Sequence, residues 1–137
     1  MLRRTITLAL AGLAIAAPPA LADHHHHTQW HSQMKVATDT ASRAAGGCTV
    51  KPGWNHSLLV TCSSRDTATF VYVFPVSHSG SGPGRVQGTP TSGVSWWGRH
   101  GTDVHDSVKV AGTTLRETVT VTDGFAQLFT VNVGYYA

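Results

Sequence analysis

A run of histidines offers the most direct chemistry in this chain. The candidate metal ligands are Asp23, His24, His25, His26, His27 and His31. If the chain is cut before Asp23, its free amine, two deprotonated amides and the His25 imidazole provide four nitrogen donors in a plane, a set that suits Cu(II) or Ni(II). The remaining histidines add further imidazoles, and histidine-rich tracts are a composition typical of metal binding. The alternative is a soluble, pH-responsive leader without a selected metal, and no cofactor is required elsewhere.

A second group of versatile side chains occupies the eleven residues from Trp96 to Asp106. It comprises Trp96, Trp97, Arg99, His100, Asp103, His105 and Asp106. The tryptophan pair with Arg99 could stack on a sugar or on a partner protein. The histidines and aspartates could instead hold zinc or calcium. A purely structural interpretation also fits, because neighbours on a strand point to opposite faces, so that one tryptophan is buried and the other exposed.

No catalytic framework accompanies these residues. The sequence has neither a Gly-x-Ser-x-Gly elbow nor a His-Glu-x-x-His pair. Glu117 is the only glutamate, so paired carboxylates are scarce. We therefore predict a binding protein rather than an enzyme, with an extracellular protein or a cell-surface glycan as its partner. A small extracellular hydrolase is an alternative hypothesis.

One segment resembles a known family. The stretch His100-Gly101-x-x-x-His105, followed by Val108, Val110 and the terminal Tyr135-Tyr136, is similar to secreted lactococcin-type bacteriocins. The resemblance covers at most the last 45 residues. It implies a small β-sandwich that acts on cell-wall synthesis, and a secreted antibacterial effector is therefore a further functional hypothesis.

The first 22 residues have the pattern of an export signal. Basic Arg3 and Arg4 precede the apolar run 6–17, prolines break the run, and Ala-Leu-Ala at 20–22 is a small-x-small cleavage signal. The run is shorter than the roughly 20 apolar residues that a membrane-spanning helix needs. We expect residues 1–22 to be a signal peptide, the protein to be secreted, and no transmembrane segment to follow.

Charge argues against a nucleic-acid partner. The net charge is +3 over 137 residues, and two of the basic residues belong to the export signal. Without Arg3 and Arg4, eight basic residues stand against seven acidic ones, and no basic run remains. A nucleic-acid-binding surface needs a concentration of positive charge that this composition does not contain.

Cys48 and Cys62 are the only cysteines, and an exported protein enters an oxidising compartment. If two strands pair so that Cys48 faces Cys62, Val50 faces Val60 as well. The agreement between register, apolar pattern and bridge geometry predicts a cross-strand disulfide.

The remaining pattern is that of strands. Segment 69–76 is apolar on both faces and predicts a central strand, while 77–92 is rich in Gly, Ser and Pro and predicts a loop. Most odd-numbered residues from 115 to 133 are apolar, which predicts a hairpin with its turn at 122–124. Glu117 and Gln127 interrupt that face, so we expect it to be partly exposed or bulged.

These segments predict an all-β protein. About seven short strands without a helix favour a two-sheet antiparallel β-sandwich of immunoglobulin-like size, stapled by one disulfide. We place this domain at 48–137. Residues 23–47 are polar and weakly patterned, and we expect them to form a flexible, histidine-rich N-terminal arm outside the core.

Overall fold

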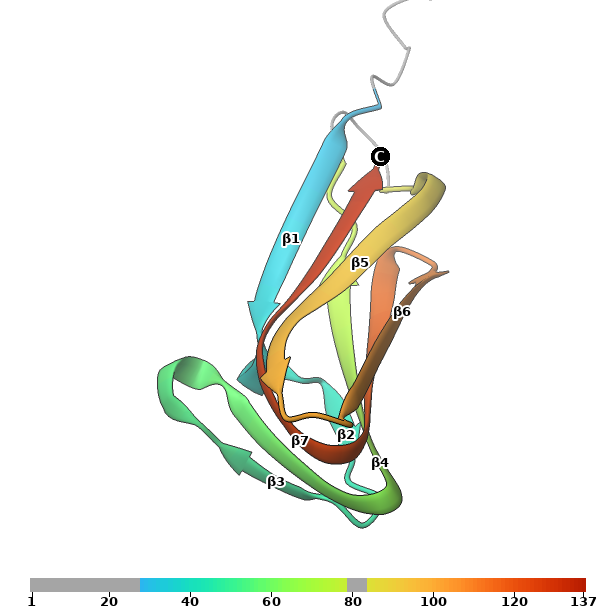
Figure 1. Cartoon of the computed structure of the whole chain (residues 1–137). Helices are drawn as coiled ribbons and strands as arrows, with labels where there is room; N and C mark the ends of the chain where they lie inside the picture. Colours follow the sequence, from blue (N-terminus) through green and yellow to red (C-terminus); the bar gives the residue numbers. More distant parts are fainter. Residues whose placement is uncertain (1–27, 79–83) are drawn as a thin grey trace, which may run out of the picture.

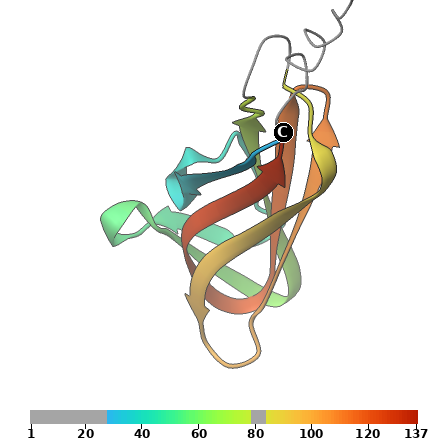
Figure 2. The same cartoon turned by 90° about the horizontal axis from the view of Figure 1, so that it is seen from above.

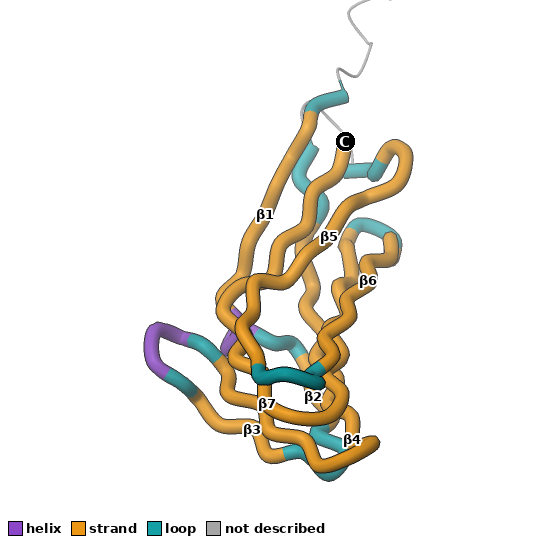
Figure 3. The backbone as a smooth tube through the Cα atoms, viewed as in Figure 1, coloured by secondary structure: helices purple, strands orange, loops and turns teal. Residues whose placement is uncertain are grey.

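The computed structural model describes residues 28–78 and 84–137. The expected signal peptide and the histidines from His24 to His27 lie outside this part of the chain. The elements are β1 (Trp30–Val36), η1 (Ala37–Asp39), β2 (Ser42–Ala44), β3 (Thr49–Pro52), η2 (Trp54–His56), β4 (Leu58–Pro75), β5 (Gln87–Gly98), β6 (Asp103–Ala111) and β7 (Thr114–Tyr136). Figure 3 shows that strands dominate the path and that the helical pieces are single turns. None of the helices among these residues has the length and apolarity that crossing a membrane requires.

The all-β prediction is confirmed, but the strands form one sheet and not two. All seven strands belong to a single antiparallel sheet, which curls round on itself as a half-barrel (Figures 1 and 2). β7 is the central strand. From its beginning to its end, it pairs with β4 and then β1 along one of its edges, and with β6 and then β5 along its other edge. β4 and β7 are long strands that continue from one side of the curl to the other. The two sides of the curl therefore share these strands and are not separate sheets.

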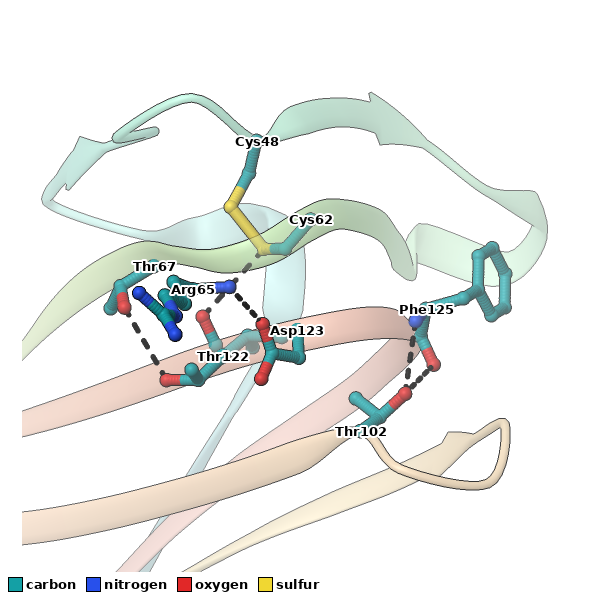
Figure 4. Close-up of a disulfide and its surroundings, with 9 residues drawn as sticks. Cys48, Cys62, Arg65, Thr67, Thr102, Thr122, Asp123 and Phe125 are labelled. Carbon is teal, nitrogen blue, oxygen red and sulfur yellow. Dashed lines mark hydrogen bonds between the residues drawn. A yellow bond between two sulfur atoms is a disulfide. The ribbon is translucent and has the colours of Figure 1, made fainter.

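The predicted hairpin at 122–124 is wrong, because β7 bends there without turning back. Asp123 and Gly124 have φ angles of 56° and 70°, which turn the strand and change the side that faces inward. β4 bends opposite the same point, where its register with β7 shifts between Cys62 and Thr67. The backbone N–H of Arg65 donates to the Asp123 carboxylate and ties the two bends together (Figure 4).

The core fills the inside of this curl. The inward residues of β7 change phase with each irregularity: Leu115, Val119 and Val121, then Ala126 and Leu128, then Val131, Val133 and Tyr135. β4 contributes Phe70, Tyr72 and Phe74, each fully buried, as its alternation predicts. β4 is also central as expected, because β7 pairs along one edge and β2 and β3 pair along the other.

The disulfide prediction is confirmed. Cys48 and Cys62 are bonded, and β3 pairs with β4 so that Val50 faces Val60. The bridge closes the β3–β4 hairpin beside the bend (Figure 4). It therefore fastens the outer hairpin to the corner at which the sheet changes direction.

Within the expected N-terminal arm, segments 30–36 and 42–44 are strands of the sheet. β1 pairs along its whole length with the end of β7, and Ala37 is fully buried. The Tyr72 hydroxyl donates to the Ala37 carbonyl over 2.8 Å. β1 is hard to recognise in the sequence because its inward-facing positions carry polar residues, such as His31 and Gln33.

Candidate functional site

All four tryptophans are exposed, while the buried aromatic residues are phenylalanine and tyrosine. The exposed fractions are 49% for Trp30, 71% for Trp54, 39% for Trp96 and 57% for Trp97. Tryptophan carries the largest apolar side chain, and a protein that needs it only for stability buries most of it. The exposed tryptophans therefore define the candidate functional surface.

The expectation that one of Trp96 and Trp97 is buried is wrong. The two do point to opposite faces, because Trp96 lies across from Leu128 and Trp97 across from Gln127. β5 is an edge strand whose described ladder is with β7 alone. The half-barrel is open beside it, so Trp96 is exposed although it lies on the inward side.

Three tryptophans gather on the opposite, outward side of β7. We define the outward aromatic face as the outer surface of β7 from Phe125 to Tyr136 with the side chains that flank it from β1, η2, β4 and β5. Trp30, Trp54 and Trp97 reach this face from three elements that are far apart in the sequence. Each of them contacts an aromatic ring of β7.

Trp97 and Phe125 mark one end of the outward aromatic face. Their ring centroids lie 6.1 Å apart with the planes at 73°, and the Arg99 guanidinium lies 5.1 Å from the Phe125 centroid. Beside them is a hollow of about 380 Å³. Its lining residues are Thr49, Lys51, Leu59, Thr61 and Phe125.

Trp54 lies at the middle of the face on the η2 turn. Its ring meets Phe129 edge to face, with centroids 6.4 Å apart. Ser57 fastens the turn, because its hydroxyl donates to the Trp54 carbonyl over 2.8 Å and accepts from the Gln127 amide over 3.1 Å. Trp54 is therefore the most exposed of the four tryptophans, although the turn that carries it is fixed to the sheet.

Trp30 and Tyr136 mark the other end. Their centroids lie 5.0 Å apart, and the Trp30 ring covers Gly134, where an added Cβ would lie 2.3 Å from a ring carbon. A second hollow, of about 330 Å³, opens beside this ring. It is lined by Trp30, Ser32, Thr91, Ser92, Gly93, Asn132, Val133 and Gly134.

The predicted cluster from Trp96 to Asp106 is not brought together as a single site. His105 and Asp103 form an exposed pair, with Nε2 and Oδ2 2.9 Å apart. Asp106 instead accepts a hydrogen bond from Ser92 over 2.7 Å, and His100 lies in an exposed turn. In residues 28–78 and 84–137, no three metal-ligating side chains converge. Of this cluster, Trp97 and Arg99 join the outward aromatic face.

Glu117 is a buried carboxylic acid at a position where the sequence pattern indicated an exposed or bulged face. We expected an exposed or bulged face here, but Glu117 is fully buried, and neither carboxyl oxygen has a hydrogen-bond partner of good geometry. Burial, reinforced by the nearby Asp106 carboxylate, raises the pKa of Glu117 to about 9, while Ser92 opposes the rise.

The histidine tract divides at the start of β1. His31 packs against Tyr135 with ring centroids 5.5 Å apart, and its Nε2 is buried without a hydrogen-bond partner. Asp23 and the four histidines that follow it lie outside the described residues. Copper or nickel binding there stays a prediction.

The known proteins offer no template for this arrangement. No protein family, curated protein or solved structure matches the chain in the comparisons.

Proposed function

We propose that this is a secreted binding protein without catalytic activity, and that it holds an extracellular partner on its outward aromatic face. One observation carries the proposal: Trp30, Trp54 and Trp97 come from distant segments to a single face and remain exposed. Several large apolar side chains exposed on one face of a small protein are typical of a recognition site.

The packing of the rings favours tight binding. A ring braced against a second ring loses little side-chain freedom when a partner covers it, so most of the burial appears as affinity. Interface tryptophans typically cost about 2 kcal/mol or more when they are truncated at the centre of a contact. The two hollows, lined in part by Trp30 and by Phe125, add concave surface at which a partner's groups can be enclosed.

Two features support a place outside the cell. The first 22 residues carry the pattern of an export signal. The Cys48–Cys62 bridge is the kind of bond that forms and persists in an oxidising compartment. Mass spectrometry of the protein from culture medium would test export, and an intact N-terminal segment on a cell-associated protein would contradict it.

Sedimentation tests the binding function directly. The purified protein is mixed with the cells and extracellular matrix of its producing organism, and the bound fraction is measured. We expect Trp97→Ala to lose binding and Trp96→Ala to keep it, because these neighbours lie on opposite sides of β5. Equal behaviour of the two variants would reject the outward aromatic face as the site.

The competing hypotheses need separate assays. A growth-inhibition spot test addresses an antibacterial effector, and a panel of generic hydrolase substrates addresses an enzyme. Reproducible killing or turnover that His100→Ala abolishes would replace the binding proposal. If neither activity is found and sedimentation depends on Trp97, the binding proposal is kept.

A further inference from the structure

We infer that the partner on the outward aromatic face is a linear, uncharged polysaccharide chain that lies along β7 from Tyr136 to Phe125. The inference rests on the proposed binding function and specifies its ligand. It follows from the linear order of the aromatic rings and from the polar, glycine-containing floor between them.

The rings follow the strand in order. Along β7 they stand at Tyr136 with Trp30, at Phe129 with Trp54 and at Phe125 with Trp97. The twelve residues from Phe125 to Tyr136, at about 3.3 Å each, extend roughly 35 Å along one face. A compact ligand would contact one of the three ring pairs, whereas an extended chain can contact all of them.

The floor between the rings suits sugars. Gly93 carries no side chain there, and Ser32, Thr91 and Asn132 supply hydroxyl and amide groups at the hollow beside Trp30. Aromatic rings have a negative face, which attracts the polarised C–H groups on the apolar side of a pyranose. Hydroxyl and amide groups exchange hydrogen bonds with the sugar hydroxyls in the same plane.

The small aliphatic content of the face favours a glycan over a protein, and the confinement of its charged residues to the Phe125 end leaves the rest of the path without charge. No carboxylate lines either of the two hollows, and the cationic residues Lys51 and Arg99 both lie near Phe125. The large apolar side chains exposed near this face are aromatic apart from Met34. A protein interface normally has a desolvated core in which aliphatic groups pack beside the rings.

A length series tests the inference. Calorimetric titration with β-1,4-linked glucose and N-acetylglucosamine oligomers, from dimers to hexamers, distinguishes the two sugar types. For at least one type, we expect Kd to fall by about tenfold or more between dimer and hexamer, as successive ring pairs are occupied. Undetectable binding of both hexamers and of insoluble cellulose and chitin would overturn the inference, and so would an affinity independent of length.

Matched variants locate the chain. Trp30→Ala and Trp97→Ala remove rings at opposite ends, and each should weaken hexamer binding by about tenfold or more. Trp96→Ala is the control, and its Kd should stay within about twofold of the unaltered protein. If Trp96→Ala weakens binding as much as Trp97→Ala does, the polysaccharide does not lie on the outward side.

Gly93→Gln tests the path without removing a ring. Gly93 lines the hollow, and a Cβ at this position meets no atom within 4 Å, so a side chain can be added there without a clash at its first atom. The substitution should weaken the binding of the hexamer more than that of the dimer, and the melting temperature of the protein should not change. Hexamer binding equal to that of the unaltered protein would place the ligand elsewhere.

The two proposals can fail separately. If sedimentation depends on Trp97 but survives digestion of the matrix polysaccharides, and the oligomers do not bind, the binding function holds and the polysaccharide is rejected. If sedimentation does not depend on Trp97 and the oligomers do not bind, both are rejected. Thermal melting of each variant confirms that a loss of binding is not a loss of folding.

Discussion

Glu117→Gln should remove a large pH dependence from the protein's stability. In the folded protein, burial and the neighbouring Asp106 raise the pKa of Glu117 from 4.5 to about 9. Between these two values the folded protein keeps a proton that the unfolded chain has released. The free energy of unfolding therefore falls as pH rises, by up to about 1.4 kcal/mol per pH unit from this group.

The window is wide enough to measure. From pH 5.5 to pH 8.5 the contribution of Glu117 should fall by as much as about 4 kcal/mol, a large share of the roughly 5–15 kcal/mol that holds a domain of this size folded. The stabilising contribution is fully present below pH 4.5 and is lost as pH approaches 9. Glutamine has the shape of the protonated acid and does not titrate, so the variant should resemble the unaltered protein near pH 5 and exceed it increasingly at higher pH.

Urea unfolding of both proteins at pH 5.5, 7.0 and 8.5 provides the comparison. Every other residue is the same in both proteins, so the difference between the two free energies isolates Glu117. A difference that does not change with pH would show that Glu117 is already ionised in the folded state and would refute the reasoning. Asp106→Asn is the companion variant: without the neighbouring charge the pKa of Glu117 should fall, and the loss of stability should be complete at a lower pH.

Three further predictions concern other parts of the chain. Cys62→Ser should lower the free energy of unfolding by about 2–4 kcal/mol, and titration of two free thiols in the native secreted protein would contradict the bridge. Gly124→Ala should destabilise by about 1 kcal/mol or more, because φ is 70° and the new Cβ would lie 2.4 Å from Thr102 Oγ1; an unchanged denaturation midpoint would count against this account of the bend. A mature chain that begins at Asp23 should bind Cu(II) 1:1 with a nitrogen-only d–d band that His25→Ala abolishes and His27→Ala keeps. Acetylation of the amine should abolish the same band, and a different first residue in mass spectrometry would exclude the chelate.

The sequence by itself determined the features that depend on near neighbours. The β3–β4 register follows from Cys48, Cys62 and the apolar residues between them, because only one pairing lets every partner meet. The inward alternation of Phe70, Tyr72 and Phe74 is likewise visible, since a strand's period of two acts over a few residues. These local rules were sufficient for an all-β protein with one disulfide.

Only the tertiary structure decided how distant segments combine. The apolar pattern after Leu115 fits a hairpin as well as a bent strand, and the choice depends on β4 and β1, which pair with β7 from far away in the sequence. Burial of Glu117 depends on the same packing. The outward aromatic face joins Trp30, Trp54 and Trp97 across about half of the chain, and no local spacing relates them. Their proximity is a consequence of one long central strand that collects partners along its whole length.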